Sequence, residues 1–129
     1  MLDTNICISA MRRTSSKLVE RLKQHADALC VSTITVHELQ HGIRRARNTE
    51  DEEFKVGAML SLLSVLPFDT AAATHSGEIH AQFATQGRVI GAYDMLIAGH
   101  ARSRGLTVVT NNLREFSRVD QLGCENWLS

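Results

Sequence analysis

Leu106-Thr107-Val108-Val109-Thr110, followed by Asn111-Asn112, is the clearest β-strand in the chain, because it is a short apolar run rich in β-branched residues. Residues 93–104, directly before it, are predicted to form a helix that ends at Gly105. A helix that leads into a short apolar strand is typical of the crossover connection between parallel strands. This stretch therefore predicts a parallel sheet covered by helices.

The same alternation of strands and helices extends toward the N-terminus. Leu29-Cys30-Val31-Ser32 is predicted to be a buried strand, and Val65-Leu66-Pro67-Phe68 a short strand whose proline marks its end or a sheet edge. Helical spacing predicts helices over residues 15–28, from 33 or 35 to 43, over 50–63, from 69 or 70 to about 86, and over 93–104. Alternation of this kind predicts the α/β class with a central parallel sheet.

Length and composition favour one domain over residues 1–129, with 43% hydrophobic residues to fill its core. Fourteen basic and fourteen acidic side chains cancel, so the basic excess typical of nucleic-acid-binding proteins is absent, although local patches are still compatible with such binding. Three widely spaced cysteines favour free thiols in a reducing cytosol. Because neither a signal peptide nor a membrane span is found, we expect a cytoplasmic protein without membrane contact.

Acidic and polar residues follow the predicted strands. Asp3 follows Leu2, Glu38 lies one turn into a helix, Asp94 opens another helix, and Thr110-Asn111-Asn112 ends the clearest strand. Each has an ordinary explanation, for example Asp3 as the N-cap of a helix over residues 4–11. However, the carboxyl ends of parallel strands meet at one sheet edge, and clustered carboxylates there favour a hard cation. The convergence predicts a site for Mg²⁺ or Mn²⁺.

His37-Glu38-Leu39-Gln40-His41 matches the H-E-x-x-H pattern of zinc hydrolases. Its two imidazoles would share one helix face, and Glu38 would serve as the general base. The longer form of the pattern requires a glycine and a third histidine at positions that hold Arg44 and Arg47, although a Glu in residues 50–53 could supply a third ligand. A zinc hydrolase built on His37 and His41 is therefore kept as an alternative.

Four ordered blocks of sequence carry a family resemblance across essentially the whole chain. Their order and spacing resemble those of PIN-domain ribonucleases, most nearly the VapC toxins of bacterial toxin–antitoxin pairs. The blocks are Met1-Leu2-Asp3-Thr4-Asn5-Ile6; Ser32-Thr33-Ile34-Thr35-Val36-His37-Glu38-Leu39 with Gly42; Gly91-Ala92-Tyr93-Asp94-Met95-Leu96-Ile97-Ala98-Gly99-His100-Ala101; and Thr110-Asn111-Asn112-Leu113-Arg114-Glu115-Phe116.

The resemblance implies a three-layer α/β/α fold and a Mg²⁺- or Mn²⁺-dependent endoribonuclease whose usual substrate is tRNA. It makes Asp3, Glu38 and Asp94 the catalytic, metal-binding carboxylates. Thr4 or Asn5, together with Thr110, would support them. The family's fourth acid usually falls at Asn112, whose amide can ligate but adds no charge, so a second tightly held metal is less expected. The resemblance also implies a homodimer and a cognate VapB-like antitoxin that blocks the acidic cleft.

Substrate binding would need cations and stacking groups near those acids. Arg44 and Arg45 end the helix that carries Glu38, Arg102 ends the helix that carries Asp94, and Tyr93 could stack on a base. The helix dipole explains the terminal arginines equally well.

Two further interpretations stay open. The apolar faces of the helices over 15–28 and 50–63 could contact an antitoxin or a second copy, or could simply form core. Because Asn112 replaces an acid and the first strand is short, a catalytically silent PIN-like binding module is the non-enzyme alternative.

Overall fold

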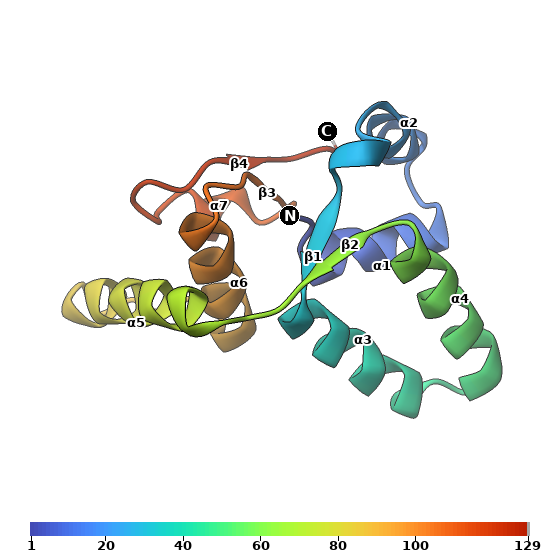
Figure 1. The fold of residues 1–129 in the computed structure, drawn as a ribbon, viewed down its shortest axis with the longest axis horizontal. Helices are drawn as coiled ribbons and strands as arrows, with labels where there is room; N and C mark the ends of the chain where they lie inside the picture. The colour runs from blue at the N-terminus through green and yellow to red at the C-terminus, as the bar shows by residue number, and fades with distance from the viewer. Residues whose placement is uncertain (129) are drawn as a thin grey trace.

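The computed structural model describes residues 1–128, in which short strands alternate with helices (Figure 1). None of the described helices is long and apolar enough to cross a membrane. The helices are α1 (Thr4–Arg12), α2 (Ser16–Gln24), the 3₁₀ turn η1 (Ala26–Ala28), α3 (Thr33–Arg45), α4 (Thr49–Ser61), α5 (Thr70–Thr85), α6 (Ala92–Ser103) and α7 (Leu113–Phe116). The strands are β1 (Cys30–Ser32), β2 (Ser64–Leu66), β3 (Val108–Val109) and β4 (Cys124–Glu125).

Leu2 completes the sheet between two pairs of parallel strands. β1 pairs in parallel with β2, and β3 pairs in parallel with β4. The Leu2 amide donates to the carbonyl oxygen of Cys30 at 2.9 Å, and Leu2 forms a parallel bridge with Val109. The chain at Leu2 therefore lies in the middle of the sheet, and Asp3 emerges at its carboxyl edge.

Alternate strand residues enter two separate hydrophobic cores, as the two faces of a strand require. Leu2, Val31 and Val109 lie in one core with residues of α1, α2, α3 and α4. Met1, Cys30 and Val108 lie in the other core with residues of α5, α6 and α7. Because both faces of the sheet are covered, the predicted α/β/α architecture with a short parallel sheet is confirmed.

Several predicted elements are shorter in the structure. The helix predicted over 15–28 ends at Gln24, because the chain turns at His25 into the 3₁₀ turn η1, and the His25 ring stacks on Trp127 with centroids 4.9 Å apart. The strand predicted over 106–110 pairs only at Val108–Val109. The segments α7 and β4 were not predicted, because both are too short to show a periodic pattern in the sequence.

Gly99 allows α6 to cross α5 at very short distance (Figure 1). A Cβ at Gly99 would lie 2.5 Å from the backbone nitrogen of Ser76 and 2.6 Å from its Cα. We expect Gly99→Ala to destabilise the protein by about 1–3 kcal/mol through overpacking, measured as the free energy of unfolding. The matched control is Gly77→Ala on α5, where a Cβ meets open space, and it should raise stability by up to about 1 kcal/mol. Equal stability of both variants would contradict the close helix crossing.

Candidate active site at the carboxyl edge of the sheet

Asp3 is a buried carboxylate that caps a helix and faces two other acids. It is 2% exposed, and its Oδ1 accepts a hydrogen bond from the Ile6 amide at 2.9 Å, so its ordinary role as N-cap of α1 is confirmed. Burial raises the pKa of Asp3, and the negative charges of Asp94 and Glu38 raise it further. Hydrogen bonds from the Thr110 side chain and the Ile6 amide act in the opposite direction. The cap therefore does not exclude a role in an acidic site.

Glu38 is held by a hydroxyl group from α1. Its Oε1 accepts a hydrogen bond from Thr4 Oγ1 at 2.6 Å, and Thr4 Oγ1 also lies 3.2 Å from Thr35 Oγ1. Thr4 and Thr35 are buried, whereas Glu38 is half-buried. Of the two supporting residues that sequence allowed beside Asp3, Thr4 thus contacts Glu38, and Asn5 is exposed.

Asp94 lies in the first turn of α6, which begins after Gly91 without a side-chain cap. Burial raises the pKa of Asp94, a hydrogen bond from the Asn112 side chain lowers it, and the charge of Glu115 raises it. Asn112 thus orients one of the acids where the family pattern would place a further carboxylate.

The loop after β3 connects Asp3 with Asp94. The Asn112 backbone amide donates to Thr110 Oγ1 at 2.9 Å, and the Thr110 side chain in turn hydrogen-bonds Asp3. Since the Asn112 side chain hydrogen-bonds Asp94, one three-residue segment restrains two carboxylates that are far apart in sequence. Thr110 and Asn112, both predicted as supporting residues, therefore lie next to Asp3 and Asp94.

The donor atoms suit a hard cation, although they are not gathered into a ligand group. Carboxylate, hydroxyl and amide oxygens are ligands that Mg²⁺ and Mn²⁺ prefer. The four ion pairs within residues 1–128 include none of Asp3, Glu38 and Asp94, so these acids lack a neutralising partner there. Over the same residues, however, no three His, Cys, Asp or Glu side chains stand close enough together to ligate one ion. Oxygen donors of the kind that a hard cation prefers are therefore present, and Glu38 Oε1 contacts Thr4 Oγ1.

Comparison with known proteins identifies the family of this arrangement. The PIN-domain family matches residues 1–122. This chain belongs to the PIN-domain family. Over 127 residues it is 45% identical to the tRNA(fMet)-specific endonuclease VapC of Shigella flexneri, covering 98% of this chain and 96% of that protein.

Solved structures agree with this assignment. The PIN domain matches the DNA-bound VapBC of Salmonella typhimurium with a TM-score of 0.94 and 44% identity, covering 98% of this chain and 96% of that one. VapBC2 from Rickettsia felis bound to a promoter DNA fragment gives a TM-score of 0.93 at 34% identity, covering 98% and 97% of the two chains. The predicted resemblance to VapC toxins is therefore confirmed.

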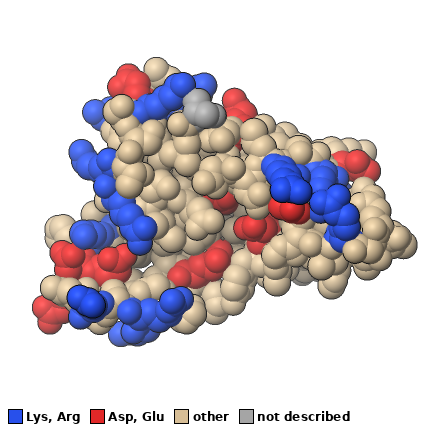
Figure 2. Space-filling view, turned by 180° about the vertical axis from the view of Figure 1, so that it is seen from behind, with Lys and Arg blue, Asp and Glu red and all other residues tan. Residues whose placement is uncertain are grey.

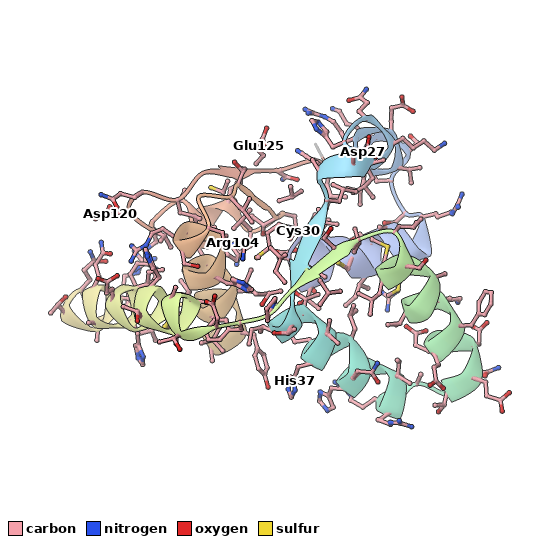
Figure 3. All side chains as sticks on the ribbon, viewed as in Figure 1. Asp27, Cys30, His37, Arg104, Asp120 and Glu125 are labelled. Atoms are coloured by element: carbon pink, nitrogen blue, oxygen red, sulfur yellow. The ribbon has the colours of Figure 1, made fainter. Side chains whose placement is uncertain are left out.

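The zinc-hydrolase pattern of this PIN domain lacks a third ligand within the described residues. His37 extends from the start of α3, away from the strands (Figure 3), and its Nε2 lies 3.1 Å from the hydroxyl oxygen of Tyr93. His41 is exposed one turn further along α3. The pair shares a helix face as expected, and the Glu38 between them contacts Thr4 instead.

Three of the residues predicted to bind RNA, Arg44, Arg45 and Tyr93, are exposed. Arg44 and Arg45 are exposed at the end of α3, and Arg45 lines a hollow of about 260 Å³ whose wall includes Glu38. Tyr93 is 45% exposed next to Asp94.

Arg102 requires a correction. Its side chain is only 11% exposed, and it donates to His75 Nδ1 at 2.9 Å and to Glu78 Oε1 at 3.1 Å. These contacts occupy Arg102 in joining α6 to α5, so it is left out of the RNA-binding surface.

Figure 2 shows acidic side chains near the middle of this face and at several of its edges, with basic groups at the left, at the top and to the right of the middle. Local patches of either sign are therefore present although the net charge is zero.

An open apolar groove lies between α1, α2 and α4, away from the acids. It measures about 920 Å³, and its walls include the side chains of Phe54 and Leu62, which are 77% and 73% exposed. The apolar helix faces predicted as contact surfaces line this groove. Exposed large side chains of this kind are typical of a protein-binding surface.

Proposed function

We propose that this PIN domain is a VapC-type toxin that cleaves tRNA with the help of Mg²⁺ or Mn²⁺. The observation that carries the proposal is that Asp3 lies at the carboxyl edge of the sheet close enough to Asp94 and Glu38 to feel their charges, and that burial raises the pKa of both Asp3 and Asp94. A cation would remove the repulsion between these charges. Asp3, Asp94 and Glu38 are the residues that would hold it, with the Asn112 amide as a neutral neighbour.

The residues of the site have different proposed roles in phosphodiester cleavage. When bound, the cation supplies a Lewis acid for the phosphate and lowers the pKa of the attacking water. Thr110 fixes the carboxylate of Asp3, Asn112 fixes that of Asp94, and Thr4 fixes that of Glu38. A carboxylate held in this way is able to accept the proton of the attacking water. Arg44 and Arg45 would bind backbone phosphates, and Tyr93 would stack on a base.

The proposed substrate is initiator tRNA. Relatives from Shigella flexneri and Salmonella typhimurium, 45% and 44% identical to this chain, are both named tRNA(fMet)-specific endonucleases. The direct test is to incubate the purified protein with tRNA(fMet) and with an elongator tRNA, in Mg²⁺, Mn²⁺ or EDTA. Cleavage of tRNA(fMet) that EDTA abolishes supports the proposal. Intact RNA in every condition would favour the silent binding module.

Metal binding has a readout that does not depend on activity. We expect Mg²⁺ or Mn²⁺ to raise the thermal midpoint of the wild-type protein, because a ligand that binds only the folded state stabilises it by about 2.7 kcal/mol at a concentration one hundred times its Kd. Differential scanning calorimetry with and without the ion measures the shift. Asp94→Asn should lose most of it. If Zn²⁺ alone shifted the midpoint, and His37→Ala removed that shift, the zinc alternative would replace this proposal.

The partner proposed for the apolar groove is an antitoxin. The solved structures from Salmonella typhimurium and Rickettsia felis are complexes named VapBC. The groove between α1, α2 and α4 is open and apolar, and its lining includes three basic residues, Arg13, Lys23 and Lys55, and one acidic residue, Asp27. An apolar lining with an excess of basic groups suits an amphipathic segment carrying acidic residues. A homodimer and a location in the cytoplasm stay predictions from the resemblance.

A further inference from the structure

We propose that His100 is a positioning residue for the acidic site. One buried hydrogen bond from His100 to Ser32 joins α6, which carries Asp94, to the start of α3, which carries Glu38. The proposal rests on the proposed ribonuclease function for its activity readout, and metal binding supplies a second, independent readout.

The contact lies inside the protein and at the origin of α3. His100 Nδ1 is 2.7 Å from Ser32 Oγ, and both residues are 0% exposed. Ser32 is the last residue of β1 and also the N-cap of α3, since its Oγ accepts a hydrogen bond from the Ile34 amide at 3.0 Å. A change in the position of this hydroxyl would therefore shift the first turn of α3. Glu38 lies in the next turn of the same helix and would move with it.

A histidine at position 100 is not explained by packing alone. Burial lowers the pKa of His100, so the ring is neutral, and its Nε2 is buried without a hydrogen-bond partner among the described residues. An unpaired buried polar atom destabilises the folded state, and a leucine would not carry that cost. The Phe68 ring packs against the imidazole in an edge arrangement, with centroids 5.6 Å apart. Phe68 thus supplies an apolar neighbour, while Asp69 and Arg104 lie close enough for their opposite charges to act on the imidazole.

The three acids differ in how firmly the fold holds them. Asp3 is held by the sheet, because the Leu2 amide donates to the carbonyl oxygen of Cys30 on one side and the Asp3 amide donates to that of Val109 on the other. Glu38 and Asp94 lie on separate helices, so their spacing depends on how α3 and α6 are joined. His100 and Ser32 make this connection in the buried interior, and His37 with Tyr93 makes a second, exposed one. Displacement of a catalytic group by about 1 Å can reduce a rate roughly 100-fold, so a connection of this kind has kinetic consequences.

Three substitutions of His100 separate positioning from packing. His100→Asn places an amide atom near the position of Nδ1, His100→Gln places one near that of Nε2, and His100→Leu removes the polar group. We expect His100→Leu and His100→Gln to lower kcat for tRNA cleavage about 10- to 100-fold with little change in KM, and to weaken Mn²⁺ binding measured by calorimetry. His100→Asn should recover most of both losses.

The matched control is Ile97→Val on the same helix, a buried change that removes one methyl group and no hydrogen-bonding atom and should leave kcat and Mn²⁺ affinity unchanged. Wild-type kcat and Mn²⁺ affinity in His100→Leu, or equal losses in the Asn and Gln variants, would overturn the proposal. If His100→Leu does not fold, the Asn and Gln variants decide. If the wild type cleaves no RNA, the proposed function fails, and the order of Mn²⁺ affinities still tests the positioning role.

Discussion

Asp94→Asn is expected to abolish RNA cleavage, lowering kcat by a factor of about 100 or more, and at the same time to stabilise the metal-free protein. The side chain keeps its shape but loses the charge that would bind the cation and oppose the neighbouring acids. Asp3→Asn should behave in the same way, because an asparagine can still accept the hydrogen bond that Asp3 accepts from Ile6. Single-turnover cleavage of tRNA(fMet) measures the first effect, and chemical unfolding in EDTA measures the second.

The stability gain should depend on pH in a defined direction. The folded-state pKa of Asp94 is raised above its ordinary value of 3.8, so its ionised form destabilises the fold at neutral pH. As pH falls through the raised pKa, the carboxyl group takes up a proton and this destabilisation disappears. The asparagine variant should therefore exceed the wild type in stability at pH 7, and this difference should shrink toward pH 4.

Asp27→Asn is a matched control, because Asp27 is an exposed acid on η1 (Figure 3). It should leave cleavage unchanged. Full activity of the Asp94→Asn enzyme would contradict the assignment of the site. A lower stability of that variant than of the wild type at pH 7 would show that the Asp94 carboxylate of the wild type is already neutralised.

Leu62→Glu is expected to prevent binding of a cognate VapB-type antitoxin, with a loss of affinity of about 100-fold or more. Leu62 is 73% exposed at the end of α4 and lines the apolar groove, so a partner would bury it together with Phe54. A buried, unpaired carboxylate at that position would oppose the complex strongly. Calorimetric titration with the purified antitoxin measures the affinity.

The same variant should still cleave RNA, because the groove and the acids lie on different elements. Its cleavage should also continue in the presence of antitoxin, whereas the wild type is inhibited. Val89→Glu provides the comparison, since Val89 is 57% exposed outside the groove. Equal weakening by both substitutions, or unchanged binding by Leu62→Glu, would place the antitoxin elsewhere.

The positions of the acids could be predicted because topology controls them. Parallel strands direct their carboxyl ends to one edge, so knowing that Asp3 and Thr110 each follow a strand was enough to expect them together. The sequence also gives the charge of each site residue, including the neutral side chain of Asn112. Strand lengths were less predictable, since Val108–Val109 pairs over only two residues while the apolar run is longer.

The contacts that hold the acids could not be predicted from spacing. Thr4 binds Glu38 across 34 residues of sequence, and Asn112 binds Asp94 from a different element. Such pairs depend on the crossing of helices, which periodicity does not encode. The engagement of Arg102 with Glu78 was missed for the same reason: an arginine at a helix end has the same sequence signal whether it faces solvent or another helix.

β1 passes into α3 without any connecting residue, since Ser32 belongs to the strand and caps the helix. One inserted or deleted residue at this point would rotate every later side chain of α3 by about 100° around the helix axis and carry Glu38 away from Thr4. By contrast, the turn between α3 and α4 lies beyond the residues of the site and can change in length without rotating them. Length variation among natural sequences should therefore be tolerated after Arg45 and selected against between Val31 and Glu38.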